Sequence, residues 1–416
     1  MTIMNMLYRN IAQRLLEALS NSPVVLLHGA RQTGKSTLAQ WVAKEKHPAR
    51  YVTLDNAAVL AAASSDPEGF LADLGTPAIL DEVQRVPELF LAIKVVVDRE
   101  RRPGQFLLTG SANVLFLPQL SESLAGRMEI LTLWPFSQGE LETIQENFID
   151  ALFSDGKPSL SKASLGRQEL IQRVLRGGYP ESVKRTTARK RMAWFESYLS
   201  TMVQRQVRDL ANIEYLTEVP RLLRLLAARV GTLINVAELS SSLGLPQTTV
   251  KRYLTLLEMT YLIQPLPAWS ASLGKRLIRS AKVALNDAGL AAYLSGLDEQ
   301  RIQQDPTRIG PLLENFVLME LRKQIGWSEA KVQLFHFRTR KGQEVDIVLE
   351  DSSGRLVGIE VKASSTVVKD DFKGLKLLRS LVANRFHRGV LLYTGQESVP
   401  FGTGLYALPV DALWRT

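Results

Sequence analysis

Residues 29–36 read Gly29-Ala30-Arg31-Gln32-Thr33-Gly34-Lys35-Ser36, which matches the pattern G-x-x-x-x-G-K-[ST] at every position. The apolar run 23–27 before it predicts a buried strand, and residues 37–42 after it predict a helix. Glycines at both ends let the backbone fold back, so that its N–H groups and the helix dipole surround phosphate oxygens. The stretch therefore predicts a site for the phosphates of a nucleotide.

Two acidic residues complete this predicted site. Asp81 and Glu82 follow the apolar residues 78–80, so that a buried strand ends in carboxylates. In such sites the loop lysine reaches the β- and γ-phosphates, the loop hydroxyl ligates Mg²⁺, one acid holds the metal and its neighbour polarises the attacking water. We therefore expect ATP and Mg²⁺ as cofactors, with Lys35 and Glu82 catalytic and Ser36 and Asp81 at the metal. The residues expected at the nucleotide are Gly29, Ala30, Arg31, Gln32, Thr33, Gly34, Lys35, Ser36, Thr37 and Asp81.

A further strand over 106–113 ends in small polar residues. A hydroxyl there could lie between the base and the γ-phosphate, with Ser111 as the first choice for a catalytic role and Thr109 as the second. An ordinary Gly-Ser turn explains either residue equally well. Strands and helices alternate as far as residue 133, which predicts a parallel α/β sheet covered on both faces.

The order and spacing of these elements resemble the AAA+ ATPases, in particular a bacterial and archaeal set with a long, poorly characterised C-terminal region. Four stretches carry this resemblance: 28–36, 80–87 (LDEVQRVP), 108–113 (LTGSAN) and 123–127 (SLAGR). The resemblance implies that Arg127 is an arginine finger, which reaches the γ-phosphate of a neighbouring subunit in a homo-oligomeric ring, a hexamer. A cation at a helix end, stabilised by the dipole, is the alternative.

The next region, 146–215, is expected to be a helical lid on a core of residues 1–145. Residues 145–167 are polar and contain Gly, Pro and Ser, which suggests a linker. Helical segments then follow over 168–176 and 186–210. Between them, Gly177-Gly178-Tyr179-Pro180-Glu181 resembles the turn that caps adenine in the lid of related ATPases, which adds Pro180 to the cofactor site. Its composition also fits a plain loop.

Residues 216–300 predict a winged helix-turn-helix domain. Apolar stripes over 222–226, 235–245 and 247–259 have helix-turn-helix spacing, and 273–283 alternates basic and apolar residues as a wing strand does. Such domains place one helix in the major groove and the wing on phosphates, although they also serve as protein–protein modules. The predicted DNA-binding residues are Thr248, Lys251, Arg252, Thr255, Lys275, Arg276, Arg279 and Lys282.

The order helix–three strands–helix–strand over 301–416 resembles the restriction-endonuclease-like fold, PD-(D/E)xK. Asp346 lies on the second strand, Glu360 and Lys362 end the third, and Glu314 on the first helix matches an accessory acid. Two carboxylates with a lysine can bind a divalent cation and align a water for phosphodiester attack. This predicts a metal site of Asp346, Glu360 and Glu314 with Lys362, in a domain that could equally persist as an inactive binding module.

Composition sets outer limits on these interpretations. A length of 416 residues indicates two or three domains, and 45% hydrophobic with 22% charged residues is ordinary for soluble proteins. We find no run of 18 apolar residues and no charged-then-apolar leader, so we expect a cytoplasmic protein without a membrane partner. The absence of cysteine excludes disulfides, thiolate metal sites and cysteine nucleophiles. The net charge of +9 favours a polyanionic partner, although a merely basic surface would give the same value.

The sequence thus predicts an α/β P-loop AAA+ core with a helical lid, a winged helix-turn-helix domain and an α/β restriction-endonuclease-like domain. The leading functional hypothesis is an ATP-hydrolysing protein that binds and remodels or translocates DNA, including branched DNA such as Holliday junctions. One alternative is an ATP-gated, Mg²⁺-dependent nuclease of a mobile-element or defence system. The other is a nucleotide-switched regulator that acts through its winged helix.

Overall fold

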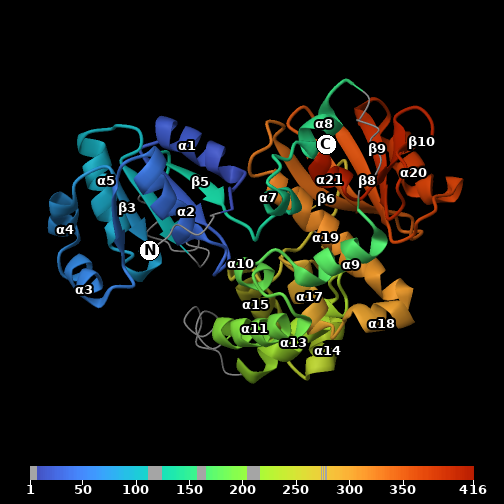
Figure 1. Cartoon of the computed structure of the whole chain (residues 1–416), viewed down its shortest axis with the longest axis horizontal. Coiled ribbons are helices and arrows are strands. Elements are labelled where there is room, and N and C mark those ends of the chain that lie inside the picture. The colour runs from blue at the N-terminus through green and yellow to red at the C-terminus, as the bar shows by residue number, and fades with distance from the viewer. Residues whose placement is uncertain are drawn as a thin grey trace. The chain divides into compact units, whose positions relative to one another are not determined.

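A computed structural model of the chain describes residues 7–110, 124–156, 165–203, 216–272, 274, 276 and 279–416. The chain forms two compact units, Met1–Phe136 with Met259–Tyr261, and Ser137–Glu258 with Leu262–Thr416 (Figure 1). Within the described residues, no helix has the length and apolar character needed to cross a membrane.

The first unit is built on a five-stranded sheet in which every pair of neighbouring strands is parallel. The strand order is β2-β3-β4-β1-β5. The three inner strands are buried along their whole length, as their apolar sequences require. The strands are β1 (Val24–His28), β2 (Arg50–Thr53), β3 (Ala78–Asp81), β4 (Phe106–Gly110) and β5 (Met128–Thr132). The expected parallel α/β sheet is therefore confirmed.

The helices of the first unit occupy the connections between these strands. They are α1 (Ile11–Asn21), α2 (Lys35–Trp41, continued by a wider π turn over Val42–Lys46), α3 (Ala57–Ser65), α4 (Pro67–Leu74) and α5 (Leu89–Arg99), with a 3₁₀ turn at Val83–Arg85. Residues of α3, α4 and α5, among them Leu71, Phe90 and Ile93, pack in one apolar cluster with Leu80 and Leu108 of the sheet. This packing fixes the end of β3, where the acidic residues lie, and the end of β4, where Thr109 lies.

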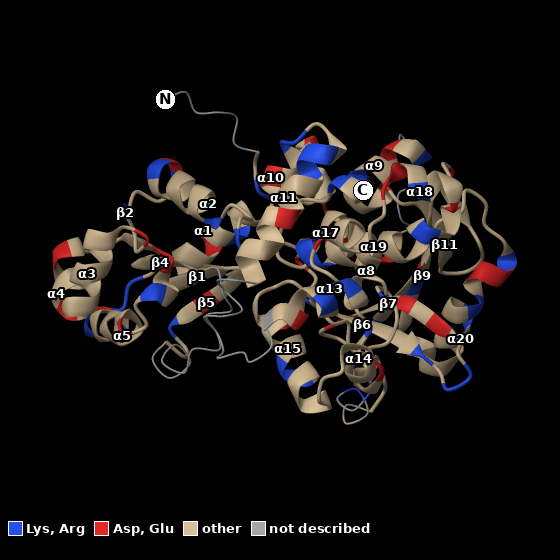
Figure 2. Ribbon diagram, turned by 90° about the horizontal axis from the view of Figure 1, so that it is seen from below, with Lys and Arg blue, Asp and Glu red and all other residues tan. Residues whose placement is uncertain are grey.

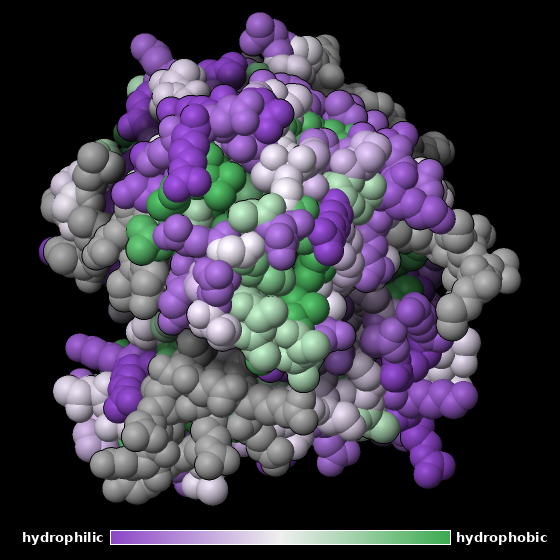
Figure 3. All heavy atoms as spheres, turned by 90° about the vertical axis from the view of Figure 1, so that its left-hand side faces the viewer, coloured by the Kyte–Doolittle hydropathy of each residue, from purple (hydrophilic) through white to green (hydrophobic). Residues whose placement is uncertain are grey.

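Helix α3 is apolar on all sides although it lies on the surface. Asn56 caps its N-terminus by accepting hydrogen bonds from the backbone N–H groups of Ala58 and Val59. Ala63 is the buried residue of the helix. Figure 3 shows apolar residues gathered over α3 and α4, and the fully exposed members on α3 are Ala57, Ala58, Ala61 and Ala62.

The C-terminal part of the second unit is a six-stranded mixed sheet in the order β10-β11-β9-β8-β7-β6. Strands β6, β7 and β8 pair antiparallel, whereas β8, β9 and β11 pair parallel. The order α-β-β-β-α-β predicted from the sequence is confirmed, and two further strands and a short helix extend it. The elements are α19 (Ile309–Gln324), β6 (Val332–Arg338), β7 (Glu344–Asp351), β8 (Leu356–Lys362), α20 (Lys373–Val382), β9 (Phe386–Tyr393), β10 (Val399–Pro400), β11 (Leu405–Pro409) and α21 (Ala412–Arg415), with 3₁₀ turns at Lys369–Phe372 and Ala383–Arg385.

The other regular elements that the structure describes in the second unit are helices. They are α7 (Gln138–Glu142), α8 (Phe148–Phe153), α9 (Arg167–Arg176), α10 (Pro180–Val183), α11 (Ala188–Thr201), α13 (Val219–Ala227), α14 (Val236–Leu243), α15 (Gln247–Met259), α17 (Ala288–Leu294) and α18 (Glu299–Gln304), with 3₁₀ turns at Leu216–Glu218 and Pro306–Arg308. Helices α13, α14 and α15 lie where the apolar spacing predicted them.

Two expectations for the second unit are corrected. Within the segment expected to be a wing strand, Gly274 and Arg276 are helical, whereas Lys282 at its C-terminal end forms antiparallel bridges with Leu233 and Leu266. Part of the expected linker is α8, whose apolar residues are buried. The polar composition of 145–167 concealed this short amphipathic helix.

Three buried carboxylates surround the start of α7, and one of them joins it to α19. The Ser137 hydroxyl donates to Glu146 Oε2 over 2.5 Å, and the Gly139 N–H donates to Glu146 Oε1 over 3.0 Å. Glu140 caps its own helix, while the Gln138 N–H donates to Glu320 over 2.8 Å. Burial, followed by the charge of Glu320, raises the pKa of Glu146 to about 8. The fold therefore favours the protonated form of Glu146.

Replacing Glu146 with Gln should remove part of the pH dependence of the stability of the second unit. The folded chain keeps this carboxyl protonated up to about pH 8, whereas the unfolded chain ionises it near pH 4.3, roughly. The contribution of this carboxyl to stability is complete below its pKa in the unfolded chain and is lost as the pH rises to its pKa in the folded chain. As the pH rises from about 5 to about 8, the wild type should lose this contribution whereas Glu146→Gln should not. The thermal midpoint of the variant relative to that of the wild type should therefore rise by roughly a few degrees over this pH range. A pH-independent difference, like that expected for the exposed control Glu329→Gln, would contradict this prediction.

Candidate functional site

The predicted phosphate loop connects the end of β1 to the start of α2. Gly29, Gln32 and Gly34 have φ angles of 142°, 63° and 96°, so the loop depends on left-handed backbone at three positions. A Cβ atom at Gly29 would lie 2.3 Å from the Leu133 carbonyl oxygen. Only glycine therefore fits at the first position of the loop.

Lys35 lies inside the loop and is buried. Its ammonium donates to the carbonyl oxygens of Gly29 and Ala30 over 3.0 and 2.8 Å. Burial lowers the pKa of Lys35 to about 8, and the charges of Glu82 and Asp81 partly oppose this shift. A bound phosphate would give the ammonium an anionic partner and would restore the pKa toward its usual value.

Asp81, at the end of β3, is held by three hydroxyl groups. Ser36 Oγ donates to Asp81 Oδ1 over 2.9 Å, and Thr109 Oγ1 donates to the same oxygen. The Tyr51 hydroxyl donates to Asp81 Oδ2 over 2.8 Å. A hydroxyl and a carboxylate are hard oxygen ligands of the kind that Mg²⁺ prefers. Ser36 and Asp81, which were predicted to meet, thus fit the metal that the loop implies.

Glu82 follows Asp81 with left-handed backbone, at a φ angle of 59°. Its N–H donates to Thr109 Oγ1 over 3.2 Å, and its carboxylate accepts from the Gln84 side-chain amide. Thr109, the second choice of the sequence analysis, therefore connects both acids. Ser111, the first choice, lies outside the described residues.

The other predicted loop residues lie along this site. Thr33 is buried and its hydroxyl donates to the Ala30 carbonyl over 3.0 Å, which stabilises the loop. Arg31 is half-buried, whereas Gln32 and Thr37 are exposed. Pro180 begins α10 in the second unit, so its role at adenine stays a prediction.

Two residues that stabilise this site, Arg9 and Tyr51, were not predicted from the sequence. Arg9 donates to the carbonyl oxygens of Thr33 and Trp134 over 2.8 and 2.6 Å, and its guanidinium stacks 4.5 Å from the centre of the Phe136 ring. Tyr51 is the other. Both contacts join positions that are far apart in the chain, so no local spacing could have indicated them.

Arg127, the predicted arginine finger, lies just before β5. Its guanidinium forms two hydrogen bonds with the Asp98 carboxylate, of 2.6 and 2.9 Å, and a third with the Ala125 carbonyl oxygen of 3.2 Å. The Asp98 partner raises the pKa of Arg127 above its usual value. Its side chain remains 27% exposed, and its action on a neighbouring subunit stays a prediction.

The acids of the predicted nuclease-like site lie together, but with a different lysine. Lys282 is 2% exposed and donates to Glu314 over 2.8 Å, with Asp346 at 3.4 Å. Lys362 instead forms an ion pair of 3.0 Å with Asp371 and is 47% exposed. The structure therefore corrects two predictions, since Lys362 does not join the acids and Lys282 is not on the surface to contact DNA.

The acids of the predicted metal site have shifted pKa values. Burial, followed by the charge of Asp346, raises the pKa of Glu314 to about 7 and that of Glu360 well above its usual value. Among the residues that the structure describes, no group of three or more His, Cys, Asp or Glu side chains is arranged to hold a metal ion.

The predicted DNA-binding residues divide into two groups. Thr248, Lys251, Arg252 and Thr255 are exposed on α15, opposite its buried apolar side, as expected, and Arg279 is also exposed. Figure 2 shows basic positions, in blue, on α15. Arg276 is instead held by Glu350 through bonds of 2.6 and 3.2 Å and lies over the Phe335 ring, which corrects its prediction. Lys275 lies outside the described residues.

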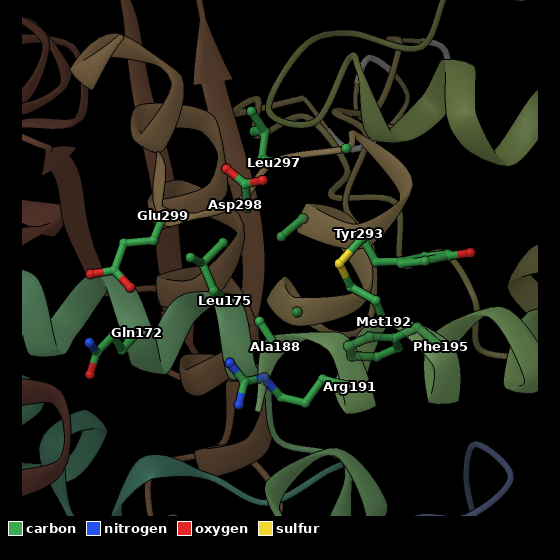
Figure 4. A pocket seen from close by; sticks show the side chains of 13 residues that line it. Gln172, Leu175, Ala188, Arg191, Met192, Phe195, Tyr293, Leu297, Asp298 and Glu299 are labelled. Atoms are coloured by element: carbon green, nitrogen blue, oxygen red, sulfur yellow. The ribbon is translucent and has the colours of Figure 1, made fainter. Parts of the chain in front are cut away.

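A cavity of about 100 Å³ lies between α9, α11 and α17 (Figure 4). Its lining includes Leu175, Met192 and a stacked pair formed by Phe195 and Tyr293, whose ring centres are 5.9 Å apart. None of the residues predicted to carry chemistry lines this cavity. The candidate functional site is therefore the loop after β1 with Asp81, Glu82 and Thr109.

This site defines a P-loop ATPase-like protein, and comparison with known proteins agrees. A family model described as "AAA domain" matches residues 21–142. Two models described as domains of unknown function, DUF8612 and DUF4143, match residues 167–301 and 309–413.

The chain is 32% identical over 408 residues to Uncharacterized protein Rv2008c of Mycobacterium tuberculosis and, at the same identity, to Uncharacterized protein Mb2031c of Mycobacterium bovis. These alignments cover 98% of this chain and 85% of each relative, so the chain belongs to the family of these mycobacterial proteins. Among solved structures, the Walker-type ATPase PABY2304 of Pyrococcus abyssi matches 70% of this chain and 96% of its own, at 16% identity and a TM-score of 0.43.

Replacing Lys282 with Met should destabilise the second unit by about 3 kcal/mol, because it leaves buried carboxylates without their cation. The matched control Lys362→Met removes an exposed ion pair and should cost less than about 1 kcal/mol. Lys282 lowers the pKa of Glu314, so its removal raises that pKa above about 7, and the loss in Lys282→Met should shrink as the pH falls from alkaline values to about 7. Urea unfolding at two pH values measures both effects, and equal losses in the two variants would show that the lysine assignment is wrong.

Proposed function

We propose that this protein hydrolyses ATP at the loop after β1 and couples hydrolysis to the binding of DNA by the exposed side of α15. The observation that best supports the ATPase part is the hydrogen bond of 2.9 Å between Ser36 and Asp81. It joins a loop hydroxyl to a strand-end carboxylate, the pair that phosphoryl-transfer sites of this class use for the metal.

Each residue of the site has a distinct part in the proposed reaction. The loop N–H groups and Lys35 bind the β- and γ-phosphates. Ser36 and Asp81 would hold Mg²⁺, whose charge offsets that of the phosphates. Glu82 accepts the proton of the attacking water, and the Thr109 hydroxyl fixes the backbone of Glu82 through its N–H.

Arg127 supplies the intersubunit part of the proposal. The Asp98 carboxylate holds its guanidinium in a two-bond arrangement that leaves part of it exposed. In a ring of identical chains the partner of each Arg127 is an adjacent copy, and a hexamer is the proposed assembly. There the guanidinium would stabilise charge on the γ-phosphate of the next subunit.

ATP hydrolysis should depend on Glu82 and Arg127, whereas ATP binding should not. We expect Glu82→Gln to lower ATP hydrolysis about 10²-fold or more, and Arg127→Ala to lower it about 10³-fold. Both variants should bind ATP as the wild type does, because neither change touches the loop. Phosphate release and a fluorescent-nucleotide titration measure the two properties. The control Arg99→Ala removes a neighbouring exposed arginine and should hydrolyse normally, and loss of ATP binding in Arg127→Ala would reject the finger assignment.

The DNA part of the proposal is supported by charge and exposure. Lys251 and Arg252 project from α15 beside the exposed hydroxyl residues Thr248 and Thr255, which suits contact with phosphates and base edges. The net charge of +9 favours approach to a polyanion. Remodelling or translocation of branched DNA would follow if hydrolysis depends on DNA structure.

The double variant Lys251→Ala/Arg252→Ala should weaken binding to duplex and four-way-junction DNA and should lower the slope of log affinity against log salt by about 2. Fluorescence anisotropy at several salt concentrations measures this slope. The control Lys373→Ala/Arg379→Ala removes two exposed cations of α20 and should leave the affinity unchanged. Equal weakening in both variants would indicate general charge attraction, and no DNA binding by the wild type at low salt would reject the DNA proposal.

The alternative of an ATP-gated nuclease is less well supported. Lys282 already provides a cation to Glu314, and Lys362 pairs with Asp371 rather than with the acids. The regulator alternative differs from our proposal in rate, because a slow switch would hydrolyse ATP without any response to DNA. The assays above therefore separate it from a DNA-stimulated ATPase.

A further inference from the structure

The Asp81 carboxylate uses most of its hydrogen-bonding capacity on hydroxyl groups. A carboxylate offers about four lone-pair positions. Ser36 and Thr109 donate to Oδ1, and Tyr51 donates to Oδ2 over 2.8 Å. The carboxylate plane turns about the Cβ–Cγ bond, which moves both oxygens, so the bond to Oδ2 adds to the resistance that the two bonds to Oδ1 offer to this rotation.

The register of the sheet explains why a tyrosine makes this second bond. Strand β2 pairs with β3 so that Thr53 lies opposite Asp81 and Tyr51 lies opposite Ile79. Tyr51 is thus two residues, about 6.6 Å, before the level of Asp81. A phenol is long enough to span that distance along the strand, whereas a serine or threonine hydroxyl at position 51 is too short.

The direction of the Ser36 hydrogen bond depends on the same arrangement. The Ser36 hydroxyl has one proton, which it donates to Asp81, so its lone pairs remain available to a cation. If the carboxylate turns, the acceptor of that proton moves and the lone pairs of Ser36 turn away with it. Tyr51 therefore acts on both ligands of the expected metal, because it donates to Asp81 and also forms a side-chain hydrogen bond with Ser36.

We propose that Tyr51 is a positioning residue that sets the affinity of the nucleotide site for Mg²⁺ by fixing the Asp81 carboxylate. This inference rests on the proposed function, because it requires a nucleotide at the loop. Tyr51 lies on strand β2, outside both the phosphate loop and the acidic pair. Groups of this kind that orient metal ligands typically change metal affinity by about 10- to 100-fold.

The test measures nucleotide binding rather than turnover. ADP is titrated into the full-length protein by calorimetry, once with a chelator and once over a series of Mg²⁺ concentrations. In the wild type, Mg²⁺ should tighten ADP binding. In Tyr51→Phe, which keeps the ring and removes the hydroxyl, we expect ADP affinity without Mg²⁺ to stay within about twofold of the wild type. The half-saturating Mg²⁺ concentration should rise about tenfold.

Two further variants control the experiment. Tyr8→Phe removes another phenol hydroxyl from the same unit, where the ring packs edge-on against Trp41, and it should behave as the wild type. Tyr51→Thr has a hydroxyl that is too short to reach Asp81, so it should require as much Mg²⁺ as Tyr51→Phe. A Tyr51→Thr variant that needs no more Mg²⁺ than the wild type would overturn the inference even if Tyr51→Phe failed to fold.

The remaining outcomes are distinct. An unchanged Mg²⁺ requirement in Tyr51→Phe would overturn the inference, and so would an equal loss of ADP affinity with and without Mg²⁺, which indicates a merely structural role. Failure of the wild type to bind ADP under any condition would instead overturn the proposed function. Failure of the positioning role and failure of the nucleotide site are therefore separated by the wild-type titration with chelator.

Discussion

The parallel alignment of β3, β4 and β1 is the constraint on which the candidate site depends. Parallel pairing brings the carboxyl ends of these strands to one edge of the sheet, where the loop after β1 and the acids after β3 both lie. Because β4 separates the two strands, the loop and the acids are not direct neighbours. Thr109 on β4 and Ser36 at the start of α2 bridge that gap by donating to Asp81.

The local parts of this arrangement could be predicted from the sequence, because each is encoded within a few residues. The glycines and lysine of the loop have fixed spacing, and the acids directly follow an apolar strand. The long-range parts could not be predicted. Tyr51 lies 30 positions from Asp81, and Arg9 lies 24 positions from Thr33. Neither separation carries a periodic signal, since sheet register and loop folding decide both contacts.

The C-terminal sheet shows how a correct element order can accompany a wrong assignment of side chains. The order of helices and strands follows from apolar periodicity and was predicted correctly. The lysine was not, because Lys282 comes from 64 positions before Asp346 and reaches the acids only after the chain has folded. Lys362, in contrast, follows a local Glu-x-Lys pattern, yet its strand ends where Asp371 is the nearer partner. Fold likeness thus gives little information about the chemistry of a site.

The carboxylate at Asp81 and the carboxylate pair of Glu314 and Asp346 differ in how their negative charge is balanced. At Asp81, three hydroxyl groups hydrogen-bond the carboxylate oxygens and bring no positive charge of their own. At Glu314 and Asp346, the buried ammonium of Lys282 already supplies that charge. Burial of a carboxylate is costly unless a cation or a proton compensates it. The first arrangement suits a metal that enters with its nucleotide, whereas the second suits a permanent contact that holds the fold together.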